Sequence, residues 1–160
     1  GTVEENLKMA KPDATKEEME AVLQKVNLLG FLQTQDGLQT QLLEKASNLS
    51  GGQCQRLVIA RALLRTDSAV YIFDEAASNI DVESEELIMN VIHELAKTKT
   101  VLLISHRLAN VVKSDKIYFL KDGEIKESGK HDELMSQNGA YRHLYESQMA
   151  LENYGKGGVA

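Results

Sequence analysis

The sequence predicts an α/β fold in which a helical segment precedes a parallel sheet. Short, continuous apolar runs at residues 69–73, 100–105 and 116–120 are typical of strands buried in a parallel sheet. A helical pattern separates the first two runs, and strand–helix–strand order favours parallel strands joined by right-handed crossovers. Before residue 64, by contrast, the apolar residues recur at helical spacing.

The first predicted domain, residues 1–64, is helical. A helix is expected after Thr15, because Thr15 and Glu18 have the spacing of a capping box. The apolar residues that follow recur at helical spacing, and Gly30 is expected to end this helix. Another helix is predicted from the glycine pair at residues 51–52 through QRLVIARALL, whose apolar residues form a stripe.

The second predicted domain, residues 65–150, carries strands that end at polar residues. The first run is followed by Asp74 and Glu75, and Asp81 is placed to cap the helix that comes next. The second run ends at His106.

The rest of the chain is expected to form a hairpin, more helix and a tail. Asp122-Gly123 follows the third run and is typical of a two-residue hairpin turn. Residues 131–149 are predicted to be helical, and residues 151–160 are expected to form a flexible tail.

The amino-acid composition argues against several classes of protein. The 160 residues carry a formal net charge of −6, which argues against a main function in binding nucleic acid or anionic lipid. One cysteine excludes an internal disulfide. Arg61 interrupts the best apolar run, so no stretch reaches the roughly 20 residues of a membrane span. The N-terminus lacks the layout of a signal peptide, and the chain is expected to be soluble by itself, which is compatible with membership of a membrane assembly.

Residues 50–53, Ser-Gly-Gly-Gln, suit a phosphate group. Glycines at the start of a helix leave backbone N–H groups open to close approach, and the helix dipole favours negative charge there. Ser50 and Gln53 add side-chain donors. A flexible, capped turn would produce the same four residues, so both interpretations stay open.

Asp74, Glu75 and His106 stand at the carboxyl ends of predicted strands, where open parallel sheets bind their ligands. Asp74 would bind Mg²⁺, directly or through water, while Glu75 would orient or activate an attacking water. His106 would contact a terminal phosphate. An ordinary acidic turn and an ordinary loop histidine are the alternatives.

The order of these segments resembles the nucleotide-binding domain of ATP-binding cassette (ABC) transporters. On this resemblance Leu49 to Gln53 match the signature motif, Val70 to Asp74 the Walker B strand, and Ser78 to Asp81 the D-loop. The ending, from KDGEIKESG to residue 150, resembles exporter-type domains, and GTVEENL resembles the stretch after the family's Q-loop.

The resemblance implies a RecA-like P-loop NTPase core, preceded by an α-helical signature subdomain. It implies that Glu75 and His106 are catalytic, that Asp74 binds Mg²⁺ through water, and that Ser78 and Asp81 act in the D-loop. It also implies that Ser50, Gly51, Gly52 and Gln53 bind ATP held by the facing subunit of a head-to-tail dimer.

The main phosphate-binding motif of this family does not occur in the sequence. The pattern G-x-x-x-x-G-K-[ST] would need a glycine five residues before Gly129 or Gly155, where Glu124 and Ala150 stand. The chain is therefore expected to be the C-terminal part of such a domain, lacking the P-loop and the Q-loop and inactive alone. An artificially shortened chain and a partial gene product are both open.

The leading hypothesis is thus an ATPase segment of a membrane exporter. Its expected ligands are ATP and Mg²⁺. Its expected partners are a second nucleotide-binding domain, identical or different, and the transporter's membrane domains, at the cytoplasmic face of the cell membrane. One alternative is a non-catalytic interaction module that completes a partner's ATP site through its signature loop. Another, an ATPase of DNA repair, is disfavoured by the acidic balance and the exporter-like ending.

Overall fold

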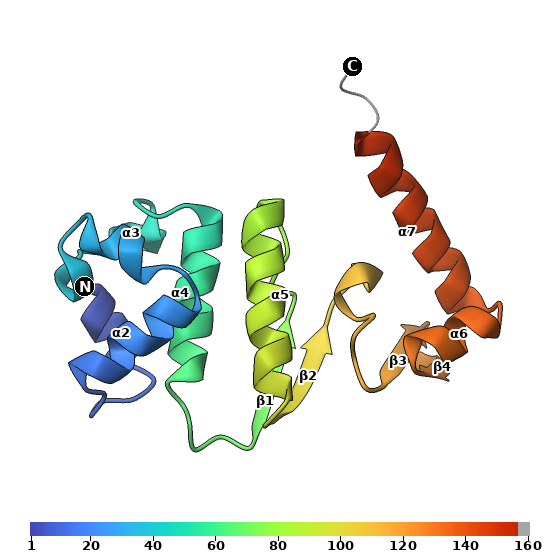
Figure 1. Ribbon diagram of the computed structural model, residues 1–160, viewed down its shortest axis with the longest axis horizontal. Helices are drawn as coiled ribbons and strands as arrows, with labels where there is room; N and C mark the ends of the chain where they lie inside the picture. Colours follow the sequence, from blue (N-terminus) through green and yellow to red (C-terminus); the bar gives the residue numbers. More distant parts are fainter. Residues whose placement is uncertain (157–160) are drawn as a thin grey trace. The chain divides into compact units, whose positions relative to one another are not determined.

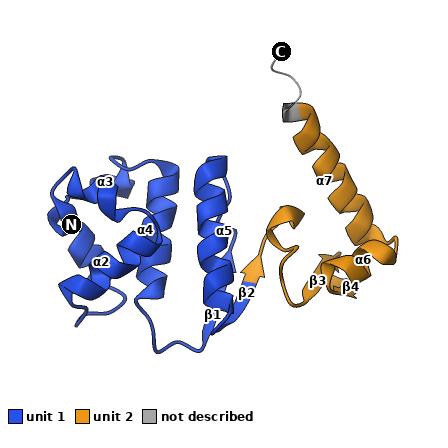
Figure 2. Cartoon of the chain, in the orientation of Figure 1, with its two compact units in different colours: residues 1–102 blue, residues 103–160 orange. Residues whose placement is uncertain are grey.

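The computed structural model describes residues 1–156 and shows two compact units, residues 1–102 and 103–160 (Figures 1 and 2). Residues 157–160, part of the predicted tail, lie outside the described residues. The division falls within a strand, whereas the sequence analysis placed a boundary after residue 64. The helix that precedes residue 64 packs against the helix of residues 82–96, which joins both segments in the first unit.

The first unit begins with short helices, several of which start at a side-chain cap. The elements are α1 (Val3–Lys8), α2 (Lys16–Lys25), α3 (Leu29–Gln33), two 3₁₀ turns (Gly37–Gln39 and Glu44–Ala46) and α4 (Gly51–Leu63). The predicted capping box of α2 is confirmed. The Glu18 N–H donates to Thr15 Oγ1 at 3.2 Å, and the Thr15 N–H donates to Glu18 Oε2 at 2.9 Å.

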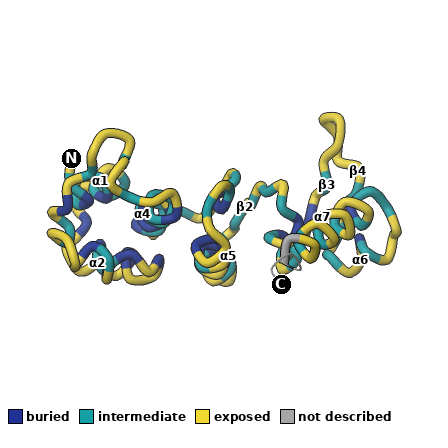
Figure 3. Tube along the Cα trace, turned by 90° about the horizontal axis from the view of Figure 1, so that it is seen from above, coloured by how far each residue is buried: buried dark blue, intermediate teal, exposed yellow. Residues whose placement is uncertain are grey.

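The helices of this unit pack through aliphatic side chains. α2 and α4 lie against each other, and the buried stretches of α1, α2 and α4 are dark in Figure 3. Fully buried side chains from these helices and their connections are Val3, Leu7, Met19, Leu23, Leu28, Leu32 and Ile59. Each contributes roughly 1.5–3 kcal/mol relative to an exposed position, so this part has a core of its own.

A strand–helix–strand segment follows, as predicted. It comprises β1 (Val70–Asp74), α5 (Val82–Ala96) and β2 (Thr100–Ile104), and β1 and β2 form a two-stranded parallel sheet. Asp81 is the N-cap of α5, also as predicted, and accepts a hydrogen bond from the Ser84 N–H at 2.8 Å.

The burial of β1 differs from that of a strand covered on both faces. Tyr71 and Phe73 are buried, whereas Val70 and Ile72 on the other face are 56% and 65% exposed. The residues of a strand alternate between two faces, so one face of β1 is packed and the other is apolar but open.

The second unit contains a hairpin followed by two helices. β3 (Ile117–Lys121) and β4 (Glu124–Gly129) pair antiparallel, and the turn residues Asp122 and Gly123 both have positive φ, at 52° and 76°. The predicted hairpin is confirmed, since such a turn matches the twist of the strands. However, β3 does not continue the sheet of β1 and β2, because only a 3₁₀ turn (Leu108–Asn110) lies between β2 and β3, with no crossover helix.

The helices α6 (His131–Ser136) and α7 (Ala140–Lys156) complete the second unit. Its core consists of Leu108, Val111, Ile117, Leu134 and Tyr141. Helix α7 extends beyond residue 150, where the sequence analysis expected a flexible tail to begin. Leu151 and Glu152, both good helix formers, begin this stretch, and Glu152 pairs with Arg107 at 2.8 Å, which ties this part of α7 to its own unit.

Candidate functional site

The signature segment, residues 50–53, forms the capped start of α4. The Gln53 N–H donates to Ser50 Oγ at 3.2 Å, and the Ser50 N–H donates to Gln53 Oε1 at 2.8 Å. The first turn of α4 contains no acidic residue, so no carboxylate of the helix itself offsets the positive end of its dipole. The geometry therefore fits both interpretations that the sequence left open, a capped turn and an anion-binding helix start.

Gly52 brings the start of α4 against the start of α5. A Cβ atom at this position would lie 2.9 Å from the Ser84 Cβ and 3.0 Å from Asp81 Oδ2. At Gly51 the nearest atom to such a Cβ is the Asn79 carbonyl oxygen, at 4.0 Å. The structure thus places the signature segment beside the predicted D-loop within one unit. A phosphate would approach from the side of Gly51, which is exposed, because Gly52 is buried.

The sequence predicts no such contact: it leaves a phosphate site and a capped turn open for the two glycines, and the family resemblance implies that both bind ATP. Gly52 and Ser84 are far apart in sequence, and no local pattern links a helix start to a distant serine. The sequence shows only a serine three residues after Asp81, and the burial of that serine becomes visible only in the structure.

The predicted catalytic pair stands at the carboxyl end of β1. Asp74 is exposed and Glu75 is half-buried. Glu75 has a φ of +52°, in the left-handed region, which costs a residue with a Cβ roughly 1–2 kcal/mol. Its carbonyl oxygen accepts hydrogen bonds from the Ser78 N–H at 3.1 Å and from Ser78 Oγ at 2.9 Å. Residues with a side chain that adopt a left-handed backbone conformation, as Glu75 does, cluster at functional sites.

Asp81 is engaged by the helix that it caps. The hydrogen bond from the Ser84 backbone N–H, then that from the Ser84 side chain, holds the pKa of the Asp81 carboxyl below its ordinary value. The charge of Arg56 acts in the same direction. Asp81 is therefore ionised at neutral pH and lies next to Gly52.

His106 belongs to the second unit, where α7 anchors the backbone around it. Gln148 Nε2 donates to the His106 carbonyl oxygen at 2.8 Å, and Gln148 Oε1 accepts from the Leu108 N–H at 2.9 Å. The side chain of His106 is exposed. The sequence carried no signal for this anchor, because Gln148 lies a whole hairpin and a helix away from the loop it holds.

The residues present suit a magnesium ion that arrives with a nucleotide. Within residues 1–156, no group of three His, Cys, Asp or Glu side chains could hold a metal ion. Asp74 offers one exposed carboxylate. This fits Mg²⁺, which keeps several waters and usually takes only one or two protein carboxylates beside phosphate oxygens.

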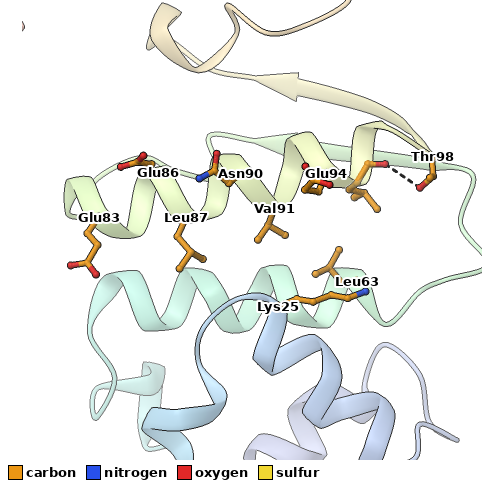
Figure 4. Close-up of a pocket in the computed structure, with 10 residues that line it drawn as sticks. Lys25, Leu63, Glu83, Glu86, Leu87, Asn90, Val91, Glu94 and Thr98 are labelled. Carbon is orange, nitrogen blue, oxygen red and sulfur yellow. Dashed lines mark hydrogen bonds between the residues drawn. The ribbon is translucent and has the colours of Figure 1, made fainter.

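A groove of about 760 Å³ runs between α4 and α5, and none of the residues that line it is a predicted site residue (Figure 4). Leu63, Leu87 and Val91 form its apolar floor, and Lys25 and several carboxylates lie along it. The acidic residues are Glu83, Glu86 and Glu94. Carboxylates repel phosphate groups, so this groove does not fit ATP.

The amino-acid sequence is similar to a known protein family and to individual members of it. Residues 1–78 match the family described as ABC transporter. An uncharacterised ABC transporter ATP-binding protein from Haemophilus influenzae is 52% identical over 152 residues, which cover 95% of this chain and 27% of the relative. An ATP-dependent lipid A-core flippase from Mannheimia succiniciproducens is 44% identical, covering 92% of this chain and 25% of the relative.

A solved structure is similar as well. A bacterial Atm1-family ABC exporter with ATP bound matches 92% of this chain and 26% of its own chain, with 30% identity and a TM-score of 0.83. The fold and the sequence matches thus define a segment of an ATP-binding domain. The chain belongs to the ABC transporter family. It spans about a quarter of the length of the relatives it matches, and none of its helices within residues 1–156 is long and apolar enough to cross a membrane.

Proposed function

We propose that this chain is a segment of the ATPase domain of a membrane exporter, and that it works in a head-to-tail dimer of nucleotide-binding domains. The observation that carries the proposal is the similarity, over 92% of the chain, to an exporter solved with ATP bound. The order of signature segment, acidic pair, D-loop and histidine along the chain supports it.

In this proposal the signature segment binds the ATP of the facing domain. The N–H of Gly51, an exposed residue at the positive end of α4, donates to a terminal phosphate. In the capping bonds Ser50 Oγ and Gln53 Oε1 accept, so the Ser50 O–H and the Gln53 Nε2–H remain available to donate to that phosphate while the cap stays formed. Such bonds to a charged phosphate are charge-assisted.

The acidic pair and the histidine act on the nucleotide of their own domain. Glu75 accepts a proton from, or orients, the attacking water, and Asp74 holds Mg²⁺ through water. His106 donates a hydrogen bond to the terminal phosphate. Phosphoryl transfer depends on such positioning and charge stabilisation, and loss of a general base typically costs about 10²–10⁴-fold in rate.

The loop that binds the phosphates of the nucleotide has to come from outside these 160 residues, because they contain no P-loop pattern. We therefore propose that the isolated chain is inactive. The domain is proposed to pair with a second nucleotide-binding domain and with membrane domains at the cytoplasmic face of the cell membrane, and not with nucleic acid.

The first test is a thermal melt of the isolated chain with and without millimolar Mg-ATP. A ligand that binds only the folded state, at a hundredfold excess over its Kd, stabilises it by about 2.7 kcal/mol. We expect a melt that ATP leaves unchanged. A clear upward shift would reveal a phosphate site that the sequence does not show and would contradict the proposal of an incomplete site.

The second test restores the missing part. Residues 1–156 replace the matching segment of the lipid A-core flippase from Mannheimia succiniciproducens, and ATP hydrolysis by the purified chimera is measured. We expect hydrolysis by the chimera and a loss of about 10²–10⁴-fold with Glu75→Gln.

The absence of the P-loop pattern favours a second candidate, a non-catalytic module that only completes a partner's ATP site. Such a module needs neither Glu75 nor His106. If the chimera hydrolyses ATP equally well with Glu75→Gln, the catalytic proposal fails and this candidate replaces it.

A further inference from the structure

Helix α5 has a half-buried apolar stripe beside the stripe that its own unit buries. Three large apolar side chains of α5 are buried in the first unit, namely Ile88, Met89 and Ile92. Leu87, Val91 and Leu95 recur at a spacing of four residues, so they share one side of the helix, and they are only half-buried. These three residues line the groove between α4 and α5. Part of their apolar surface therefore stays in contact with water.

The groove has the dimensions of a site for a helix. Its lining runs along α5 from Glu83 to Leu95, which at 1.5 Å per residue is a length of about 18 Å. Leu63 of α4 lies on the opposite wall (Figure 4). A volume of about 760 Å³ over this length has room for several large side chains from one face of an amphipathic helix.

The charges along the groove are unevenly distributed. Glu83 and Glu86 are exposed at the end where α5 begins, and within residues 1–156 neither carboxylate forms an ion pair. Lys25 lies toward the other end of the groove, as does Glu94, whose carboxylate pairs with Lys97 Nζ at 2.6 Å (Figure 4). The end of the groove at Glu83 and Glu86 therefore carries an uncompensated negative charge.

These features select one class of occupant. The apolar floor favours large apolar side chains, and the two carboxylates favour Lys or Arg beside that apolar face. The phosphate groups of nucleotides, nucleic acids and anionic lipids would be repelled. A second copy of this chain carries a net charge of −6, which also opposes its approach to an acidic groove.

We propose that the groove between α4 and α5 binds a cationic amphipathic helix of a partner protein. Large apolar side chains of that helix pack against Leu87, Val91 and Leu95, and its Lys or Arg side chains pair with Glu83 and Glu86. The groove shares no residue with the proposed ATP site. The inference is therefore independent of the proposed function and is tested without ATP.

The test measures binding of a synthetic peptide to the 160-residue chain. The probe is a helical peptide of about 15 residues, long enough to cover the groove, with leucine on one face and lysine on both sides of that face. A dye on the peptide reports binding by fluorescence anisotropy. We expect saturable binding of one peptide per chain, and no binding of a peptide with glutamate in place of lysine. Equal binding of the two peptides would overturn the inference, because the carboxylates would then select nothing.

A charge reversal locates the site on the chain. Glu86 lies beyond the first turn of α5, so little of its charge offsets the helix dipole, and its side chain is exposed. Glu86→Lys should raise the Kd of the lysine peptide by about fivefold, because an ion pair is lost and a repulsion of similar size replaces it. Glu44→Lys is the matched control, since Glu44 is exposed in the same unit outside the groove, and it should leave the Kd unchanged. Equal effects of the two reversals would show that only the net charge matters and would refute the site.

A second pair of variants separates the groove from the open apolar face of β1. Leu87→Ala should raise the Kd by about tenfold through lost apolar contact, whereas Ile72→Ala on β1 should not change it. The opposite pattern would place the peptide on β1 and contradict the inference. Circular dichroism shows whether each variant is folded, and the exposed Glu86 decides the outcome if Leu87→Ala lowers stability.

Sedimentation of the chain without peptide tests for a second copy in the groove. We expect a monomer, or an association that Leu87→Ala leaves unchanged. A dimer that Leu87→Ala dissociates would show that the groove binds another copy of the chain, and the proposal of a cationic partner helix would be wrong.

Discussion

Replacing Gly52 by alanine tests the contact between the signature segment and α5. In an ordinary helix position this change is favourable by about 1 kcal/mol, because glycine is a poor helix former. Here the new Cβ would meet the Ser84 Cβ at 2.9 Å and Asp81 Oδ2 at 3.0 Å, both closer than atoms normally approach. Overpacking of this kind typically costs about 1–3 kcal/mol, so we expect a net destabilisation of about 1 kcal/mol.

Gly51→Ala is the matched control, since its Cβ would find no atom nearer than 4.0 Å. It is expected to be neutral or slightly stabilising. Urea unfolding followed by far-UV circular dichroism measures both variants, because the chain contains no tryptophan to serve as a fluorescent probe. With a slope of about 1–3 kcal/mol per molar urea, a difference of about 1 kcal/mol should separate the two midpoints by roughly 0.3–1 M.

A double variant makes the test stricter. Ser84→Gly removes the side chain that the new methyl group meets, so Gly52→Ala together with Ser84→Gly should cost less than the sum of the two single changes. Additive costs, or a Gly52→Ala variant as stable as Gly51→Ala, would refute the reasoning from the close approach.

Four further substitutions have defined outcomes. Ala46→Gly should raise the free energy of unfolding by about 1 kcal/mol, since Ala46 has a φ of +53°, whereas Ala150→Gly within α7 should lower it by a similar amount. Glu127→Gln should destabilise the second unit by about 1 kcal/mol, seen as faster hydrogen exchange in α7, because the Glu127 carboxylate accepts from the first N–H groups of that helix. The hydrogen bond from the Ser84 N–H lowers the pKa of the Asp81 carboxyl. The ionised carboxylate therefore contributes stability above about pH 4, and this contribution is lost as the pH falls below that value. Asp81→Asn should remove this pH dependence, so that the free energy of unfolding falls less steeply in acid.

Each of these predictions would be contradicted by a defined result. Equal effects of glycine at positions 46 and 150 would show that the left-handed backbone carries no strain. An unchanged exchange rate in α7 would show that Glu127 is not its cap. Parallel acid profiles, measured as thermal midpoints from about pH 7 down to about pH 3, would show that Asp81 is not linked to stability through its ionisation. At neutral pH the asparagine variant should be nearly as stable, since asparagine caps helices as well as aspartate does.

Local signals in the sequence were sufficient wherever a few neighbouring residues decide the structure. The Thr15–Glu18 capping box, the Asp81 cap and the Asp122-Gly123 turn were all predicted and are all present. In each case the interacting groups lie within three residues of one another, so that the pattern of residue types already contains the hydrogen bonds.

Features that depend on distant segments were not predictable. The Gly52–Ser84 approach and the Gln148 anchor at His106 both join elements that meet only in the folded chain. The extension of α7 past residue 150 depends in part on the pairing of Glu152 with Arg107. For the candidate site, the sequence predicted which residues to consider, and the structure shows that the signature and D-loop residues share one unit. The catalytic roles of Glu75 and His106 stay predictions.

The open face of β1 affects how this chain should be studied. Val70 and Ile72 expose more than half of their surface next to two buried aromatic residues, so the folded first unit already presents an apolar strip to solvent. Environment-sensitive dyes that report unfolding by binding apolar surface would therefore fluoresce before any heat is applied, and their signal could hide a small effect of ATP. Circular dichroism follows the helices directly, and a detergent-free sample at low protein concentration would limit association through the same strip.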